Sequence, residues 1–570
     1  MRGRFRRILT DWGHGLDIAR RWIMGILFWG LLIFIIAGFV FSGPPRTKDG
    51  SVLVIAPFGD LVDAYASPAN YRGVPIGGYR SETLLDDLVT ALELASEDDR
   101  IAGVWVRLDD LASAGPAAAG ELADAVARFR ESGKPVIASA DTYDTMRYRI
   151  ASAADEIVVD RLGEVFVAGY GSWRAYYAEG LDKLGAEARL FRSGESKTAA
   201  ETAILDGMSE AALRDESRLL GDLWDEWIEA VSENRGIEAG DLEDWISLYD
   251  EHLAAAGGDG SAAALEGGLI DTVETGGVLE GMIVDRYGDD LRLRIDALDY
   301  VARAVRSGAG APVVAVIPVN GPLVYGEGGA GTAGSDDIVS AVTAARNVPN
   351  VAAVVVRIDS PGGDVRAGEA VRRILAETRE RWSLPVVASL GDVAASGGYW
   401  IALESDLIVT RPETVTGSIG VYTVSMTFER ALRDWLGVRI DGVGTTPWSG
   451  GGHPGRSMDE RYASLYSSGI ADIDTLFRGL VSEKRGLNEA EVIALAGGIP
   501  WSGKRALTSG LADASGGLSE ARRRAAELAG LEKWKTLYFE GPVDPREQLV
   551  GRLLWGYRGT RAAARTKAYR

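Results

Sequence analysis

The sequence predicts an α/β fold in which a mainly parallel sheet is built twice along the chain. Short apolar, β-branched segments alternate with helical stretches, a pattern typical of parallel sheets that are buried on both faces. The chain also matches itself at an offset of 250 residues: VWVRLD (104–109) with VVVRID (354–359), PVIAS (135–139) with PVVAS (385–389), and VSENRG (231–236) with VSEKRG (481–486). This internal duplication predicts two related domains, at about 52–305 and 306–535.

The N-terminus predicts a membrane anchor. WIMGILFWGLLIFIIAGFVF (22–41) carries no charge and is long enough to cross a bilayer as a helix. Six arginines precede it in 1–21, which predicts a basic cytoplasmic tail and a body on the opposite side of the membrane. A cleaved signal peptide is the alternative, but the apolar run is long and no A-x-A site follows it. We therefore expect an uncleaved transmembrane helix.

The first half predicts buried strands and one long packed helix. The expected strands are SVLVIAPF (51–58), IAGVWVRL (101–108), PVIASAD (135–141) and EIVVD (156–160). In the segment 219–236 the apolar residues recur on one helical face: Leu220, Leu223, Trp224, Trp227, Ile228 and Val231. The second half repeats this helix, with Ile473, Leu476, Phe477, Leu480 and Val481 on its apolar face. SGAGAP (307–312) is the expected joint between the halves.

Composition excludes several kinds of site and partner. The formal net charge of −21 argues against nucleic acid as a partner. The chain has no cysteine, which excludes disulfides, thiolate metal sites and a cysteine nucleophile. With only three scattered histidines we expect no metal site and no cofactor. The segment 536–570 is expected to be a basic tail, either solvated or in contact with anionic lipid.

Residues present in only one half are the best candidates for function. After the VRID strand the second half continues SPGGD (360–364), whereas the first continues DLASA (110–114). Gly362 and Gly363 can offer backbone N–H groups to a developing oxyanion, because no side chain intervenes. A plain Pro-Gly turn is the alternative.

Ser396 lies in a second such segment, GDVAASGGYW (391–400). Its counterpart in the first half, DTYDTMRYRI (141–150), has no Ser-Gly-Gly. The pattern fits a nucleophile on a tight strand-to-helix turn, or equally a small residue required for close packing. A serine nucleophile needs a base, and no histidine lies within 50 residues of Ser396.

Two further polar residues are also unmatched between the halves. Lys197 in FRSGESKTAAE (191–201) has no lysine counterpart, and Ser418 in VTGSIG (415–420) lies opposite Ala168. A buried lysine can lose its charge and accept a serine proton. The alternatives are a solvated surface lysine, and a serine that only bonds a backbone carbonyl.

Taken together, RIDSPGG, GDVAASGGYWIA, VTGSIGV and FRSGESKTAAE resemble the long, duplicated, membrane-anchored signal peptide peptidases of the S49 serine protease family. The resemblance implies two ClpP/crotonase-like domains and a Ser/Lys dyad. It assigns Ser396 as nucleophile, Lys197 as general base and Ser418 as the group that orients the amine. Gly363 and Gly397, with Gly362, would form the oxyanion site. The family commonly has YKSA around the lysine, where this chain has SKTA.

The resemblance also implies a setting and a substrate class. We expect a homotetramer in the bacterial inner membrane, with its catalytic body on the periplasmic side. The expected substrates are released signal peptides and other short or unfolded hydrophobic segments. Two other functions stay open: a catalytically silent membrane scaffold, and an acyl-CoA enzyme of the crotonase-like fold.

Overall fold

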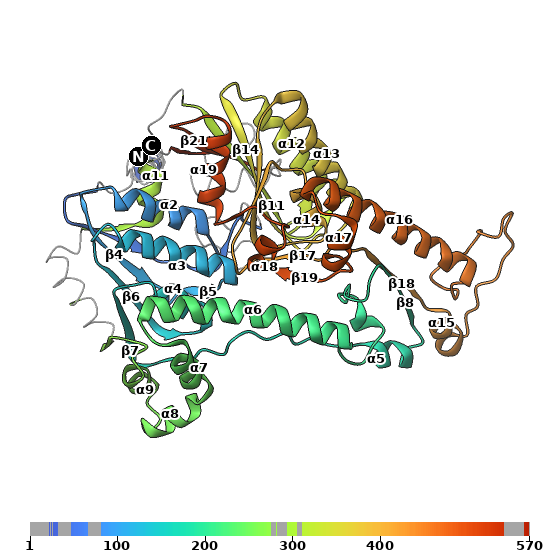
Figure 1. The fold of residues 1–570 in the computed structure, drawn as a ribbon, viewed down its shortest axis with the longest axis horizontal. Helices are drawn as coiled ribbons and strands as arrows, with labels where there is room; N and C mark the ends of the chain where they lie inside the picture. The colour runs from blue at the N-terminus through green and yellow to red at the C-terminus, as the bar shows by residue number, and fades with distance from the viewer. Residues whose placement is uncertain are drawn as a thin grey trace, which may run out of the picture.

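The computed structural model describes residues 22, 24–25, 27–31, 47–66, 81–274, 281, 293–304, 311–540 and 564–568. Within these ranges the chain forms two large sheets with helices packed against them (Figure 1). No helix of the described residues is both long and apolar enough to cross a membrane. The predicted tail at 1–21 lies outside the described residues, as does most of the predicted membrane segment at 22–41.

The first half contains a fully parallel six-stranded sheet, as the sequence predicts. In spatial order its strands are β10 (Arg294–Asp296), β1 (Ser51–Ile55), β4 (Ile101–Arg107), β6 (Val136–Tyr143), β7 (Glu156–Val165) and β9 (Thr272–Glu274). All four strands expected in this half are present. Apart from the half-buried Val54, their valines and isoleucines are buried on the sheet faces, which explains the apolar run in each segment.

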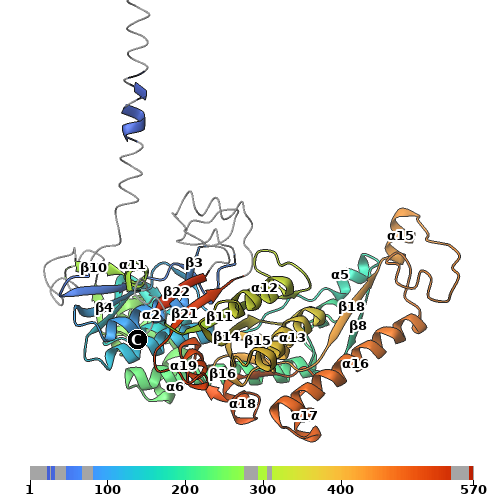
Figure 2. The same ribbon diagram turned by 90° about the horizontal axis from the view of Figure 1, so that it is seen from above.

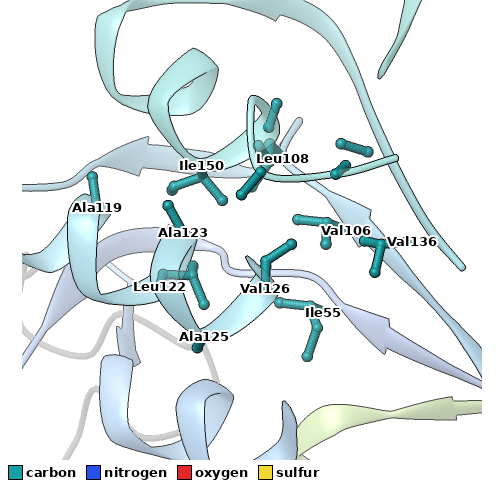
Figure 3. Close-up of a cluster of buried hydrophobic side chains, with 14 of the residues drawn as sticks. Ile55, Val106, Leu108, Ala119, Leu122, Ala123, Ala125, Val126, Val136 and Ile150 are labelled. Carbon is teal, nitrogen blue, oxygen red and sulfur yellow. The ribbon is translucent and has the colours of Figure 1, made fainter. Parts of the chain in front are cut away.

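Helices cover one face of this sheet and complete the first core. The helices of this half are α2 (Leu85–Ser96), α3 (Pro116–Arg130), α4 (Thr145–Ala151), α5 (Ala178–Lys183), α6 (Glu210–Arg235), α7 (Ala239–Ser247), α8 (Tyr249–Ala255), α9 (Gly260–Glu266) and α11 (Ala297–Ala304). Figure 3 shows how α3 packs: Leu122 and Val126 lie against Ile55, Val106 and Val136 of the sheet. Pro116 starts α3, where its missing N–H and fixed φ cost nothing.

The second half repeats this plan with additional strands. Its sheet comprises β11 (Val313–Asn320), β14 (Val351–Ser360), β15 (Val386–Ala395), β16 (Leu407–Thr410), β17 (Val415–Gly417), β19 (Pro500–Ser502), β20 (Ala514–Ser515), β21 (Lys535–Phe539) and β22 (Ala564–Ala568). β21 crosses the domain end predicted at residue 535, and its Leu537, Tyr538 and Phe539 are buried. The second core therefore extends to Phe539, and the predicted tail cannot begin at 536.

The helices of the second half confirm the offset of the repeat. They are α12 (Ser335–Arg346), α13 (Val365–Trp382), α14 (Gly397–Ala402), α15 (Glu429–Leu436), α16 (Glu460–Arg485), α17 (Glu489–Leu495), α18 (Gly503–Thr508) and α19 (Leu518–Leu528). The long helices α6 and α16 have 26 residues each and begin 250 residues apart. Phe477 and Val481 of α16 are buried as predicted, but Leu476 is 53% exposed because it lies beside the packed face.

Buried charges join the two halves. Arg357 is 2% exposed, and its Nη2 lies 2.9 Å from Asp63 Oδ1 and 3.2 Å from Glu121 Oε2 of the first half. Asp392 accepts hydrogen bonds from the N–H groups of Ala117 and Ala118 at the start of α3. The equivalent of Arg357 in the first half, Arg107, is 42% exposed. Of these two equivalent arginines, only Arg357 therefore contacts the other half.

Two elements of the first half, a helix and a strand, extend to the second half and contact it. Helix α6 runs below both halves in Figure 1 and contacts β19. Strand β8 (Glu187–Arg192) leaves the first half and pairs in antiparallel fashion with β18 (Tyr422–Thr427) of the second. Figure 2 shows this pair running beside α16 toward α15. We call β8 and β18 together the ribbon. The remaining short strands are β2 (Gly59–Val62), β3 (Glu82–Leu84), β5 (Leu111–Ser113), β12 (Leu323–Val324) and β13 (Ala333–Gly334).

Candidate active site

Ser396 lies on a tight turn between strand β15 and helix α14. Its φ of 55° and ψ of −115° are unusual for a residue with a side chain, and such a conformation costs about 1–3 kcal/mol. The turn is held because Ser396 N–H donates to the carbonyl of Gly417 at 2.8 Å and the helix begins immediately after it. Gly398 is required there, since a Cβ at this position would lie 2.6 Å from Ser360 O. The sequence interpretation of a strand-to-helix turn is thus confirmed.

The predicted glycines lie beside this turn. Gly362 and Gly363 follow β14 with φ of 94° and 154°, and an added Cβ on Gly397 would lie 3.3 Å from Gly363 N. A Cβ on Gly362 would meet Gly397 N at 2.5 Å. Among the described residues, neither Gly363 N–H nor Gly397 N–H has an acceptor. Two neighbouring amide groups are therefore free to bind an oxygen of a ligand.

The segment that follows strand β8 of the ribbon places Lys197 beside the Ser396 turn. After β8 two backbone hydrogen bonds join the chain to the second half. Ser193 N–H donates to Val421 O at 2.8 Å, and Ser196 N–H donates to Gly497 O at 3.1 Å. Gly498 makes this approach possible, because a Cβ there would lie 2.5 Å from Lys197 N. The side chain of Lys197 is 4% exposed. A lysine of one half is thereby buried against the other half of the same chain.

Lys197 Nζ contacts both predicted serines. It lies 2.9 Å from Ser396 Oγ, 2.9 Å from Ser418 Oγ and 2.7 Å from Ser418 O. A neutral amine has two N–H donors and one lone pair. If both donors bond the hydroxyl and carbonyl of Ser418, the lone pair remains for the Ser396 proton. Ser418 Oγ is 3.3 Å from Gly498 O, to which it donates in that arrangement.

Burial controls the charge of this amine. Desolvation lowers the pKa of Lys197 to about 7, because the ammonium form loses its hydration, while the carboxylate of Asp474 opposes this shift. Asp474 lies on α16 and is 9% exposed. Its Oδ2 accepts from Arg478 Nε at 2.8 Å, and its Oδ1 has no hydrogen-bond partner in the described part of the chain. Close to neutral pH a large fraction of Lys197 is therefore an uncharged base.

An ion pair between Arg192 and Glu201 stabilises the loop that carries Lys197. Arg192 Nη1 donates to Lys197 O at 3.3 Å and to Glu201 Oε1 at 2.6 Å. Glu201 is 1% exposed and also accepts from Ser209 Oγ at 3.0 Å. The pair holds the carbonyl of Lys197, while Gly498 lies against its N and Cα.

All the predicted site residues line one cavity of about 750 Å³. Ser396, Lys197, Ser418 and the three glycines lie together in its wall. The rest of the wall includes apolar side chains, among them Leu219, Val365, Trp400, Val421, Val424 and Phe477. The cavity can hold a peptide bond next to a hydroxyl, an uncharged amine and two free amides. These are the groups that acyl transfer requires.

Sequence reasoning missed Gly498, Asp474 and the Arg192–Glu201 pair. Arg192 and Glu201 stand in the same segment as Lys197, and their opposite charges were the available signal. Gly498 belongs to an unremarkable Gly-Gly pair, and Asp474 is one of several acidic residues of α16. Nothing in the local sequence distinguishes these two, because their role depends on a residue about 300 positions away.

Comparison with known proteins identifies the family. Peptidase family S49 matches residues 128–275 and 379–532, so both halves are covered. "Protease 4" of Salmonella typhi is 34% identical over 463 residues, which span 80% of this chain and 74% of that protein. "Protease 4" of Haemophilus influenzae is 31% identical and spans 90% of this chain and 85% of its own length. "Serine protease SPPA, chloroplastic" of Arabidopsis thaliana is 28% identical, spanning 85% of this chain and 70% of that protein. The chain therefore belongs to peptidase family S49 and is a serine peptidase of that family.

Proposed function

We propose that the chain is an endopeptidase with a Ser/Lys dyad, in which Ser396 is the nucleophile and Lys197 the general base. The observation that carries this proposal is the 2.9 Å separation of Lys197 Nζ and Ser396 Oγ in the cavity wall. The described histidines lie elsewhere: His252 stacks on Trp245, and His453 accepts from Gly455 N–H. Lys197 is thus the base within reach of the hydroxyl.

The mechanism is acyl transfer through a covalent intermediate. Neutral Lys197 takes the proton of Ser396 Oγ as this oxygen attacks the peptide carbonyl. The N–H groups of Gly363 and Gly397 bind the oxyanion that forms. The C–N bond then breaks, and the amine leaves with the proton held by Lys197. A water molecule, deprotonated by Lys197, cleaves the ester and restores the Ser396 hydroxyl.

The pH dependence of activity should follow Lys197. With its pKa near 7, kcat/KM is expected to fall about tenfold per pH unit below that value, because the ammonium form cannot accept a proton. The Asp474→Asn variant should move this acid limb to lower pH, since the carboxylate is what raises the lysine pKa. The matched control is Asp472→Asn, an exposed residue of the same helix. Measuring kcat/KM from pH 5 to 9 gives the position of the acid limb in the parent protein and in both variants. An acid limb that does not move in Asp474→Asn contradicts the assignment.

The proposed setting of the enzyme rests on the sequence and on the resemblance to the family. We propose that 22–41 anchors the chain in the bacterial inner membrane, with 1–21 in the cytoplasm and the two ClpP/crotonase-like domains in the periplasm. The charge-free apolar run and the preceding arginines support this topology. Contact between copies of the chain is supported by α15, which buries none of its residues and exposes Trp435 and Leu436 by 67% and 70%, and a homotetramer is the assembly that the family resemblance implies.

The proposed substrates are released signal peptides and other short or unfolded hydrophobic segments. The apolar wall of the cavity supports this choice, because such a wall gains free energy by covering apolar side chains. An anchor next to the catalytic body keeps the enzyme close to segments that leave the membrane. Peptides, and no cofactor or nucleic acid, are the ligands of the proposed reaction.

Labelling with a fluorophosphonate probe tests the nucleophile. The full chain in detergent should form one covalent adduct, and peptide mapping should place it on Ser396. Ser396→Ala should take up no label, while Ser425→Ala on the ribbon should label like the parent protein. Absence of an adduct in folded parent protein would favour the catalytically silent scaffold instead.

A further inference from the structure

Asp392 is a polar residue that only the second half carries, and the dyad does not use it. At the offset of 250 residues its counterpart in the first half is Thr142, which is exposed. Asp392 is half-buried and lies on β15, four residues before Ser396. It lies outside the wall of the catalytic cavity, so any part it has in the reaction must act through another residue.

Strand β15 bulges just before it reaches the nucleophile. Ile358 of β14 pairs with Leu390, and Ser360 pairs with Ala394, so β15 advances four residues while β14 advances two. A bulge of this kind bends the strand and re-aims the residues that follow it. The geometry of the bulge therefore helps to set the position of Ser396.

The first half contacts this bulge at two points. Asp392 Oδ1 accepts hydrogen bonds from the N–H groups of Ala117 at 2.8 Å and Ala118 at 3.0 Å, at the start of α3. Asp63 Oδ2 lies beside the buried Gly391, where an added Cβ would approach this oxygen to 2.5 Å. The bulge that leads into the nucleophile is thus packed against the other half of the chain.

Asp392 caps a helix that belongs to the other half. The N-cap residue of α3 is Gly115, which has no side chain to accept the first free N–H groups of the helix. An added Cβ on Gly115 would lie 2.1 Å from Asp392 Cγ, so the carboxyl group occupies the space of an ordinary capping side chain. Helix α4 of the first half is instead capped by its own Asp144. Loss of Asp392 therefore removes a helix cap and a link between the halves at once.

We propose that Asp392 is a positioning residue for catalysis, because it fixes the bulge before Ser396 to helix α3 of the half that supplies Lys197. The inference rests on the proposed Ser/Lys dyad and adds a second way in which the first half acts on the nucleophile. When this link is lost, the reaction should slow, because Ser396 and the amide of Gly397 follow directly after the bulge. Peptide binding should change little, since the cavity wall is intact.

Steady-state kinetics with a hydrophobic fluorogenic peptide test the link. Asp392→Ala should lower kcat about tenfold and change KM less than twofold, since a displaced nucleophile slows the reaction more than it weakens binding. Asp392→Asn should retain at least about half of the parent kcat, because its amide oxygen can accept the same two N–H groups. Burial and the carboxylates of Asp359 and Asp63 raise the pKa of Asp392 to about 7. An uncharged side chain at this position therefore resembles a form that the parent protein already populates near neutral pH.

A double variant separates positioning from helix stability. Gly115→Asp in the Asp392→Ala background gives α3 its own N-cap, in the space that the carboxyl group of Asp392 leaves. The melting temperature lost in Asp392→Ala should be recovered, but kcat should stay about tenfold low, because the link to β15 is still absent. The matched control is Asp144→Ala, which removes the cap of α4 within one half. It should lower the melting temperature and leave kcat within twofold of the parent value.

Gly115→Ala tests the link without replacing Asp392, so the proposal can be tested even if Asp392→Ala does not fold. Its added methyl group should displace the carboxyl group and lower kcat by about the same factor. Unchanged kcat in folded Asp392→Ala or Gly115→Ala would overturn the positioning role. Recovery of kcat together with the melting temperature in the double variant would also overturn it, because Asp392 would then act on helix stability alone. Full activity in Lys197→Ala would instead contradict the dyad, so the two failures are distinguishable.

Discussion

Replacing Lys197 with alanine is expected to lower kcat by at least about 10⁴-fold, because Ser396 then has no base to take its proton. Ser396→Ala should cause a loss of similar size. The double variant should be no slower than either single variant, since the two groups act as one unit. Cleavage of a hydrophobic fluorogenic peptide at pH 8 measures all three.

The matched control is Lys183→Ala, which removes an exposed lysine from the same half. It should retain full activity, and circular dichroism should show that all the variants are folded. Full activity in Lys197→Ala would eliminate the dyad, whatever the effect of Ser396→Ala.

A single methyl group at Gly498 is expected to lower kcat about 100-fold. In Gly498→Ala the new Cβ would lie 2.5 Å from Lys197 N and 2.7 Å from Lys197 Cα, so the lysine backbone must shift. A displacement of about 1 Å at a catalytic group can cost this much. Steady-state kinetics with the same peptide, combined with thermal unfolding, measure the effect on rate and on stability.

Gly497→Ala separates this clash from backbone strain. Gly497 has φ of 76° and Gly498 has φ of 88°, so alanine is strained at both positions. An added Cβ at Gly497 meets only Gly194 Cα, at 3.9 Å. Both variants should lose stability through backbone strain, and Gly498→Ala should lose more because of the clash, but only Gly498→Ala should lose most of its activity. Equal activity losses would show that contact with Lys197 is not the cause.

The fold was largely predictable because the relevant signals are local or repeated. Each buried strand carries its own apolar run, and the offset of 250 residues is retained by helices α6 and α16. The second domain extends beyond its predicted end because Lys535–Phe539, a short segment after helix α19, joins the sheet. Whether such a short segment joins a sheet depends on the strand it meets, here β11.

The candidate site was predictable to a lesser degree. Comparing the two halves singled out Ser396, Lys197, Ser418 and the glycines, because these residues interrupt an otherwise repeated pattern. The same comparison could not find Asp474 or Gly498. A carboxylate in a helix and a Gly-Gly pair are common, and they matter here only because Lys197 lies against them.

The sequence by itself determined the duplicated α/β plan, the absence of thiol chemistry and the residue types available for catalysis. Strand and helix periodicity are properties of neighbouring residues, and a repeat is visible without knowing any contact. Only the tertiary structure decided that Lys197 is 4% exposed and lies 2.9 Å from a serine 199 positions away. The pKa of an amine depends on the water and charge around it, and that environment exists only once the ribbon has joined the two halves.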